Sequence, residues 1–189
     1  MKKTTEHEVG PEAGYQALLL AGELQPDISQ SRAVNALERL HRELLTFSEV
    51  NNRLNQRSLS LLWPFRFLTK KNNGLAVPKG VYLYGGVGRG KSMLMDLFFS
   101  VSRIDQKKRV HFHEFMLEVH ARLKAINEHS AQKRKQDSRH MSGDHDPIPV
   151  VAQEIADETI LLCFDELHVT DIADAMVLTR LFDVLFELG

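Results

Sequence analysis

The chain has 189 residues with 43% hydrophobic and 26% charged residues, which is typical of a globular protein with a core of its own. Its net charge of −1 provides no global field that would draw it to nucleic acid or to an acidic membrane surface. No apolar segment approaches the roughly 18 residues that a membrane span needs. Acidic residues follow the N-terminal lysines, so neither a secretory signal nor a transit peptide is predicted. Together with the single cysteine, this favours a cytoplasmic bacterial protein.

The N-terminal region predicts two helices. The first covers about residues 12–21 and ends at Gly22. The second covers about residues 30–54, with an apolar stripe at helical spacing, and either Asp27 or Ser29 can cap it. The stripe fits a helix that supports a larger domain at least as well as a surface for a partner.

An apolar stretch and a loop follow these helices. Residues 58–67 are rich in leucine and aromatic residues around Pro64, which favours packing structure, although an exposed patch could dock a partner. Residues 69–79 carry Asn, Gly and Pro and predict a loop. The apolar segment 81–84 then predicts the first strand of a core sheet.

A phosphate-binding motif comes directly after this segment and before a predicted helix over residues 93–101. It is the pattern Gly-x-x-x-x-Gly-Lys-Ser, formed by Gly85, Gly86, Val87, Gly88, Arg89, Gly90, Lys91 and Ser92. The glycines allow backbone N–H groups to turn inward around an anion, and the positive end of the following helix dipole adds to that site. Lys91 is expected to bind the β and γ phosphates, and Ser92 to bind Mg²⁺. The motif therefore predicts Mg-ATP as the ligand.

The middle of the chain predicts a second strand over 109–113 and a helix over 114–128. His111 and His113 would share one face of that strand, and such a lone pair is more often structural than metal-binding. The polar segment 130–146 predicts a surface loop. Its short basic run at 133–135 fits solvated charge better than nucleic-acid binding.

A second motif lies near the C-terminus. After a short predicted helix over 150–156, residues 159–164 form an uninterrupted apolar run, which predicts a strand buried on both faces. Cys163 in this run is predicted to be a small buried hydrophobe. Asp165 is expected to hold Mg²⁺, and Glu166 to orient and polarise the attacking water.

The structural alternative for these acids is that Asp165 or Asp171 caps the amphipathic helix predicted over 172–188. Asp171 is expected to cap or nearly cap this helix. Gly189 occupies the position of a C-terminal glycine cap.

Three segments, 80–96, 109–116 and 162–176, resemble in order the motifs of the AFG-one-like ATPases, and the resemblance extends over most of the chain from about Tyr15. It implies an α/β P-loop NTPase of the AAA+ (ASCE) type, with helices flanking a parallel sheet. It also implies ATP hydrolysis with Mg²⁺, a homo-oligomer, and an arginine supplied by a neighbouring subunit. Bacterial members are linked to cell division and to the tubulin-like division-ring protein FtsZ.

The chain departs from this family at its end, since members continue beyond the position of Gly189 into another strand, a sensor asparagine, an arginine finger and a lid. The family's sheet order, 5-1-4-3-2, places that strand between the segments at 81–84 and 159–164. The expected organisation is therefore an N-terminal helical segment, 1–57, and a partial P-loop ATPase core, 58–189. We expect such a chain to fold poorly and to hydrolyse ATP weakly or not at all.

Three functional alternatives follow from these motifs. A nucleotide-binding scaffold would bind ATP without turnover, and a nucleic-acid ATPase such as a helicase loader would show a basic groove with aromatic residues. A small-molecule kinase is a weaker option, because paired Asp and Glu residues suit the activation of water.

Overall fold

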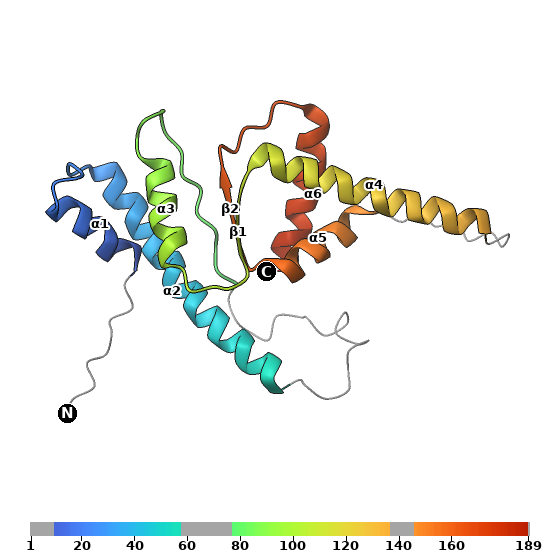
Figure 1. Ribbon diagram of the computed structural model, residues 1–189, viewed down its shortest axis with the longest axis horizontal. Helices are drawn as coiled ribbons and strands as arrows, with labels where there is room; N and C mark the ends of the chain where they lie inside the picture. The colour runs from blue at the N-terminus through green and yellow to red at the C-terminus, as the bar shows by residue number, and fades with distance from the viewer. Residues whose placement is uncertain (1–9, 58–76, 137–145, 189) are drawn as a thin grey trace. The chain divides into compact units, whose positions relative to one another are not determined.

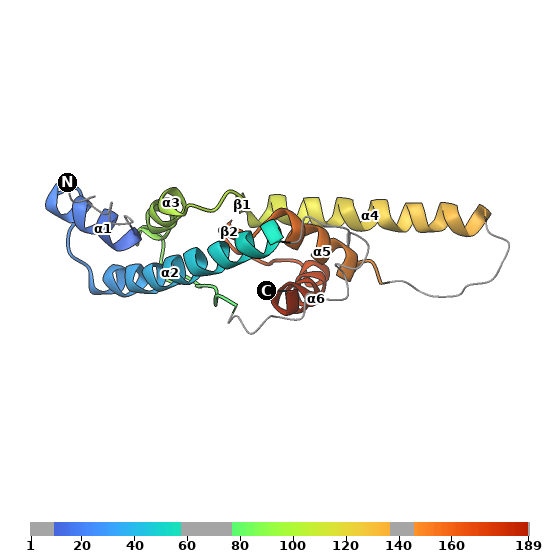
Figure 2. The ribbon, with the colours of Figure 1, turned by 90° about the horizontal axis from the view of Figure 1, so that it is seen from below.

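A computed structural model describes residues 10–57, 77–136 and 146–188 of the chain. These residues belong to two compact units, an N-terminal unit up to Asp105 and a C-terminal unit from Gln106, and each is described by itself. The N-terminal unit contains α1 (Pro11–Leu20), α2 (Ile28–Arg57) and α3 (Lys91–Val101). The C-terminal unit contains β1 (Lys107–His111), α4 (Phe112–Gln136), α5 (Ile148–Glu158), β2 (Leu161–Asp165) and α6 (Ile172–Leu188). Figure 2 shows α2 and α4 as long, unbroken helices.

The junction of α1 and α2 follows the sequence signals. Gly22 has a φ of 74° and its N–H donates to Leu19 O at 3.1 Å, which ends α1 in a left-handed turn that glycine adopts without strain. Asp27 caps α2, because its Oδ1 accepts hydrogen bonds from the N–H groups of Ser29 at 2.6 Å and Gln30 at 3.0 Å. The predicted end of the first helix is confirmed, and Asp27 provides the cap.

The three helices of the N-terminal unit pack against one another around an apolar core (Figure 1). Gly14 lets α1 approach α3 closely, since a Cβ at this position would lie 2.5 Å from Leu97 Cδ1. Tyr15 of α1 is only 1% exposed. Other buried apolar side chains include Val34, Leu37, Leu40 and Leu44 of α2, and Leu94 and Phe98 of α3. The helix that follows the phosphate-binding motif is therefore held by α1 and α2.

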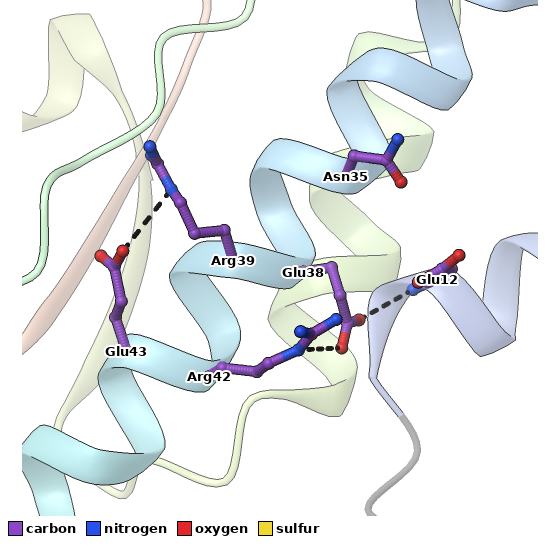
Figure 3. A pocket seen from close by; sticks show the side chains of 6 residues that line it. All are labelled: Glu12, Asn35, Glu38, Arg39, Arg42 and Glu43. Atoms are coloured by element: carbon purple, nitrogen blue, oxygen red, sulfur yellow. Dashed lines mark hydrogen bonds and ion pairs between the residues drawn. The ribbon is translucent and has the colours of Figure 1, made fainter.

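A polar contact between α1 and α2 supplements this core (Figure 3). Gly10 at the N-cap of α1 has no side chain, and Glu38 of α2 reaches this end and accepts a hydrogen bond from the Glu12 N–H at 3.2 Å. Arg42 holds the same carboxylate from one turn further along α2, with Nε 3.1 Å from Oε1. A carboxylate at a helix N-terminus is stabilised by the helix dipole. Glu38 thus caps α1 from a neighbouring helix.

Residues 81–84 differ from the prediction, because they form no strand with any segment that the structure describes. A strand exists only through hydrogen bonds to a neighbour. The predicted segment 58–67 and residues 69–76 of the predicted loop 69–79 lie outside the described residues.

The C-terminal unit is built on a two-stranded parallel sheet in which Lys107 pairs with Leu161 and His111 with Asp165. Helices α4, α5 and α6 share one apolar core (Figure 1). Val110, Leu162 and Phe164 pack from the strands against it. Phe164 is central to this core. Its ring centroid lies 4.8 Å from that of Phe115 in an edge-to-face arrangement, and 6.2 and 6.0 Å from the ring centroids of Phe112 and Phe182. The core members from the helices are Phe112, Phe115, Met116, Val119, Ile148, Val151, Ala152, Ile155, Leu178 and Leu181.

Two predictions about this unit need correction. The strand ends at His111 and α4 begins at Phe112, so His113 is helical and does not alternate with His111 on a strand. The segment predicted as a loop from residue 130 instead continues α4 to Gln136, because its polar residues are good helix formers. Residues 137–145 of the predicted loop lie outside the described part of the chain.

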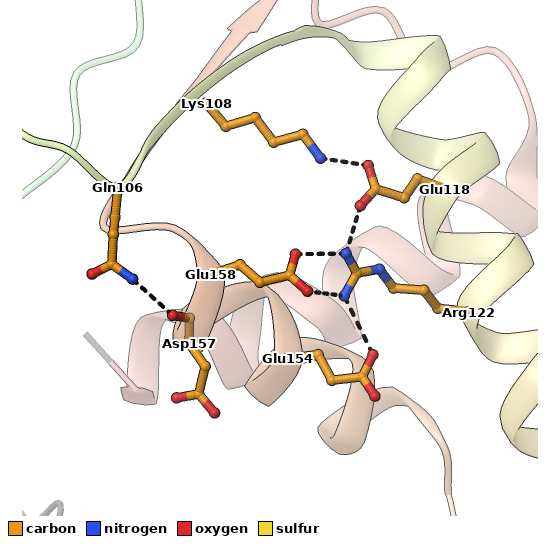
Figure 4. Close-up of polar contacts among 7 residues, drawn as sticks. All are labelled: Gln106, Lys108, Glu118, Arg122, Glu154, Asp157 and Glu158. Atoms are coloured by element: carbon orange, nitrogen blue, oxygen red, sulfur yellow. Dashed lines mark hydrogen bonds and ion pairs between the residues drawn. The ribbon is translucent and has the colours of Figure 1, made fainter.

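Arg122 joins three elements of the C-terminal unit in an ion-pair network (Figure 4). From α4 it donates to Glu118 at 2.7 Å and to Glu158 of α5 at 2.6 Å. Lys108 of β1 donates to the other oxygen of Glu118 at 2.5 Å. Burial raises the pKa of Glu118, but the hydrogen bonds from Lys108 and Arg122 outweigh it and hold this pKa below its ordinary range. The hydrogen bond from Arg122 likewise lowers the pKa of Glu158, against the effect of burial. The network fixes α4 and α5 beside the start of the sheet.

Within the N-terminal unit, which ends at Asp105, α1 and α2 pack directly against α3. In the part of the chain that the structure describes, no helix is both long and apolar enough to cross a membrane.

Candidate functional site: the phosphate loop and the acidic strand end

The phosphate-binding motif forms a loop whose backbone only glycine adopts readily. Gly85, Gly88 and Gly90 have φ values of 147°, 77° and 81°. Gly90 is also sterically restricted, since a Cβ there would lie 3.0 Å from Gln30 Nε2. Left-handed conformations of this kind cost other residues roughly 1–2 kcal/mol each. The positions of the glycines therefore fit the course of the loop.

Lys91 is the first residue of α3, and its side chain turns back over the loop. Its Nζ donates hydrogen bonds to Gly85 O at 2.9 Å and to Gly86 O at 2.8 Å. An ammonium group in this position places a positive charge at the mouth of the loop. Ser92, the next residue, is exposed.

The N-terminus of α3 favours an anion at the same place. The first intrahelical hydrogen bond runs from the Leu94 N–H to Gly90 O at 2.9 Å, and Gly90 has no side chain with which to cap the helix. The N–H groups before Leu94 have no acceptor within the helix, and they carry the positive end of its dipole. Loop, lysine and helix end thus provide the three elements of a phosphate site.

The start of α2 contacts the outside of this loop. Gln30 Nε2 donates to Arg89 O at 3.3 Å, and Arg89 Nη1 lies 3.9 Å from Asp27 Oδ2. The N–H groups of Gln30 and Ser29 lower the pKa of Asp27 from its ordinary value, and Arg89 adds to this effect. The phosphate-binding motif does not include Gln30. From the sequence, Asp27 is predicted only as one of two candidate caps of α2.

A cavity of about 300 Å³ lies between the start of α2 and the loop. Its lining includes Gln30 and Ala33 of α2, and Tyr84, Gly85 and Lys91. Lys91, whose ammonium group contacts the loop, therefore borders this cavity.

The acidic motif lies at the end of β2 in the C-terminal unit. Asp165 is its last residue, and its side chain is 13% exposed. Arg109 of β1 holds both carboxylate oxygens, with Nε 2.6 Å from Oδ2 and Nη2 3.3 Å from Oδ1. No sequence signal indicated this pair, because Arg109 and Asp165 are 56 residues apart and parallel pairing brings them together.

Glu166 directly follows the strand and is exposed, with a φ of 52°. It is the single residue other than glycine with a positive φ in the described parts of the chain. A left-handed residue reverses the course of the backbone at the strand end, and for a residue with a Cβ it stores strain of roughly 1–3 kcal/mol. Such strain is often found at functional positions.

Two residues near this acidic pair, Asp171 and Cys163, have structural roles. Asp171 caps α6, because its Oδ1 accepts a hydrogen bond from the Ala173 N–H at 2.7 Å, as the sequence predicted. Cys163 is buried, and burial raises the pKa of its thiol to about 11, as expected for a small hydrophobe in a strand.

The predicted site residues therefore fall into two groups. The phosphate loop from Gly85 to Ser92 lies in the N-terminal unit, and Asp165 and Glu166 lie in the C-terminal unit. Each group has defined geometry within its own unit.

Comparison with known proteins adds evidence of descent. Residues 9–189 match the family described as AFG1-like ATPase. The cell division protein ZapE of Escherichia coli is 38% identical over 96% of this chain and 44% of its own length. Lactation elevated protein 1 homolog B of Danio rerio is 54% identical over 59% of this chain and 22% of its own length. The protein C115.02c of Schizosaccharomyces pombe is 36% identical over 98% of this chain and 42% of its own length.

No solved structure matches the chain. The chain spans less than half the length of each of these relatives. The family match covers nearly all of it, including the phosphate loop and the acidic strand end. The chain belongs to the AFG1-like ATPase family.

Proposed function

We propose that this protein binds Mg-ATP at the loop from Gly85 to Ser92 and hydrolyses it. The observation that carries this proposal is the position of Lys91 Nζ, 2.9 and 2.8 Å from the carbonyl oxygens of Gly85 and Gly86. It places a cation over a glycine loop that leads into a helix N-terminus. Phosphoryl transfer requires this combination of positioning and positive charge.

Magnesium suits the oxygen ligands that the proposal assigns to it, the Ser92 hydroxyl and the Asp165 carboxylate. Among the described residues, no three His, Cys, Asp or Glu side chains are grouped for a metal. Mg²⁺ usually keeps several waters and binds through one or two protein groups together with substrate phosphates. Bound there, it would neutralise charge on the β and γ phosphates. Asp165 would have to exchange its Arg109 partner for this role.

Lys91 and Glu166 have the catalytic roles in this proposal. Lys91 stabilises charge on the transferring phosphoryl group, and Glu166, exposed beyond the strand end, orients the attacking water and accepts its proton. The proposal extends to a complete AAA+ sheet and to a homo-oligomer in which a neighbouring subunit provides an arginine. Both rest on membership of the family.

ATP binding and hydrolysis by the chain, beside two variants and their matched controls, test the proposal. Lys91→Ala is expected to abolish binding, whereas Lys79→Ala removes an exposed lysine outside the motif and leaves it intact. Glu166→Gln is expected to retain binding and to lower kcat by about 100-fold or more. Glu187→Gln, a change at an exposed position of α6, is the control. Equal activity in Glu166→Gln and in the parent would exclude the role of Glu166.

A second candidate function, nucleotide binding without turnover, is favoured by the pair between Arg109 and Asp165. The guanidinium holds both oxygens of the proposed Mg²⁺ ligand, so hydrolysis requires that this pair opens. The two candidates differ in a single-turnover experiment. Hydrolysis of bound ATP supports the enzyme, and release of unchanged ATP supports the scaffold.

The process that the ATPase serves is also a proposal. A relative with 38% identity over 96% of the chain is named a cell division protein, and we propose a cytoplasmic role in bacterial division with FtsZ as a candidate partner. ATP-dependent co-sedimentation with FtsZ polymers tests it. Salt-sensitive binding to single-stranded DNA in place of FtsZ would instead favour the helicase-loader alternative.

A further inference from the structure

We propose that Gln30 is a positioning residue for the phosphate loop and that Tyr15 holds Gln30 in its working orientation. This inference rests on the proposed function of the loop. It assigns a role in nucleotide binding to two residues that lie outside the sequence motif, on α2 and α1.

The side-chain amide of Gln30 is engaged at both ends. Its Oε1 accepts a hydrogen bond from the Tyr15 hydroxyl at 3.2 Å, and its Nε2 donates to Arg89 O at 3.3 Å. Tyr15 is 1% exposed and fixed in the core between the helices. The Arg89 carbonyl can only accept a hydrogen bond, so the amide nitrogen faces the loop and the amide oxygen is left to accept from Tyr15.

This contact fixes the direction of one peptide group in the loop. The Arg89 carbonyl and the Gly90 N–H belong to the same planar trans peptide, so they point in opposite directions. A carbonyl that points to Gln30 therefore directs the Gly90 N–H away from Gln30. A phosphate loop binds an anion through backbone amide groups of defined direction, and this contact fixes the direction of one of them.

Two further observations place Gln30 at the loop. Its Nε2 would lie 3.0 Å from a Cβ at Gly90, so the amide packs against the glycine with a φ of 81°. Gln30 also lines the cavity of about 300 Å³ that Gly85 and Lys91 border. The contact of Asp27 with Arg89 is longer, at 3.9 Å, and exposed, so it contributes less.

Gln30→Leu is the principal test, because it keeps a similar volume and removes both hydrogen bonds. In the chain without nucleotide, amide hydrogen exchange of residues 86–91 is expected to be roughly fivefold faster, as the loss of one hydrogen bond implies. The ATP dissociation constant is expected to rise by a similar factor. Gln16→Leu, the same change at an exposed position of α1, should leave both unchanged.

Two further variants separate positioning from general stability. Tyr15→Phe removes only the hydroxyl, and it should produce a smaller change in the same direction. Gln30→Glu keeps an acceptor for Tyr15 but has no donor for Arg89 while it is ionised. Amide hydrogen exchange of the loop in this variant should slow relative to the parent as the pH falls through the pKa of the new carboxyl group. The protonated carboxyl group can again donate a hydrogen bond to the Arg89 carbonyl.

The outcomes distinguish this inference from the proposed function. Faster exchange confined to the loop supports the positioning role, even if the parent chain binds no ATP and the proposed function fails. Unchanged exchange in Gln30→Leu, or an equal increase throughout α1, α2 and α3, overturns the inference. Tight ATP binding by the parent and unaltered binding by Gln30→Leu would overturn it and leave the proposed function standing.

Discussion

The phosphate loop and the acidic strand end are specified in different ways. The loop is contained in eight consecutive residues, and its shape follows from the positive φ values of Gly85, Gly88 and Gly90. The environment of Asp165 instead comes from Arg109 on a neighbouring strand and from the helices that pack against the sheet. Both motifs can be recognised in the sequence, but only the shape of the loop follows from its own residues, whereas the contacts of Asp165 depend on tertiary pairing.

The same contrast appears in how each site is supported. Gln30 of α2 and Asp27 at its N-cap contact the loop and add to a conformation that the glycines already allow. The strand end is instead supported by pairing with β1, by Arg109 and by the helix side chains that pack on Phe164. We therefore expect substitutions in the core of the C-terminal unit to disturb the acidic site more than the loop.

The largest expected effect comes from Phe115→Ala, which removes a ring that is 2% exposed and contacts Phe164 at 4.8 Å. A cavity of this kind lowers the free energy of unfolding by about 3–5 kcal/mol. Leu117→Ala, at a position 57% exposed on the same helix, is the control and should cost about 0.5 kcal/mol or less. Hydrogen exchange should show loss of protection in β2 and α6. An equal loss in α3 would contradict the comparison.

The buried thiol next to the acidic end predicts a pH dependence. The pKa of Cys163 is raised from 9.0 to about 11 by burial, so the unfolded chain releases this proton before the folded chain does. Its stabilisation is complete below pH 9 and is lost as the pH rises to about 11, by up to about 2.7 kcal/mol. Urea unfolding at several pH values measures it. Cys163→Ala should lose this part of the dependence, and parallel curves for the two proteins would exclude it.

Arg109→Gln tests whether the acidic end depends on its partner strand. It leaves Asp165, whose side chain is 13% exposed, without a bidentate cation, and it should lower the free energy of unfolding by about 1.5–3 kcal/mol. Lys124→Gln removes an exposed pair with Glu128 at 3.9 Å and should cost less than about 1 kcal/mol. Chemical denaturation compares them. Equal costs would show that Arg109 acts only as a surface charge.

Gly90→Ala has the smallest expected effect on stability and tests the backbone origin of the loop. A φ of 81° is strained for alanine, and the new Cβ would meet Gln30 Nε2 at 3.0 Å. The strained backbone conformation at position 90 should cost roughly 1–2 kcal/mol. Because ATP binding requires this conformation of the loop, the affinity measured by calorimetry should fall about tenfold. Gly80→Ala is the matched control, because nothing lies within 4 Å of its Cβ position. Equal ATP affinity in both variants would contradict a backbone requirement at Gly90.

Local signals in the sequence predicted much of the fold. The helix after the phosphate loop, the cap at Asp27, the turn at Gly22 and the cap at Asp171 all depend on a few neighbouring residues. The apolar run around Cys163 forms β2 over Leu161–Asp165, close to the predicted 159–164. Two segments differ from the prediction. Segment 81–84 forms no strand in the described part of the chain, because a strand depends on pairing with a neighbour, and residues 130–136 continue a helix because of their helix propensity.

The sequence by itself determined the phosphate loop, because glycine φ angles, a lysine and a helix start act within eight residues. It also determined the ligand class that we propose and the family to which the chain belongs. Only the tertiary structure brought Arg109 to Asp165 and Tyr15 to Gln30, across 56 and 15 residues. These contacts depend on strand pairing and helix packing, which no short sequence pattern encodes. The amide of Gln30 faces the loop because packed helices hold it there.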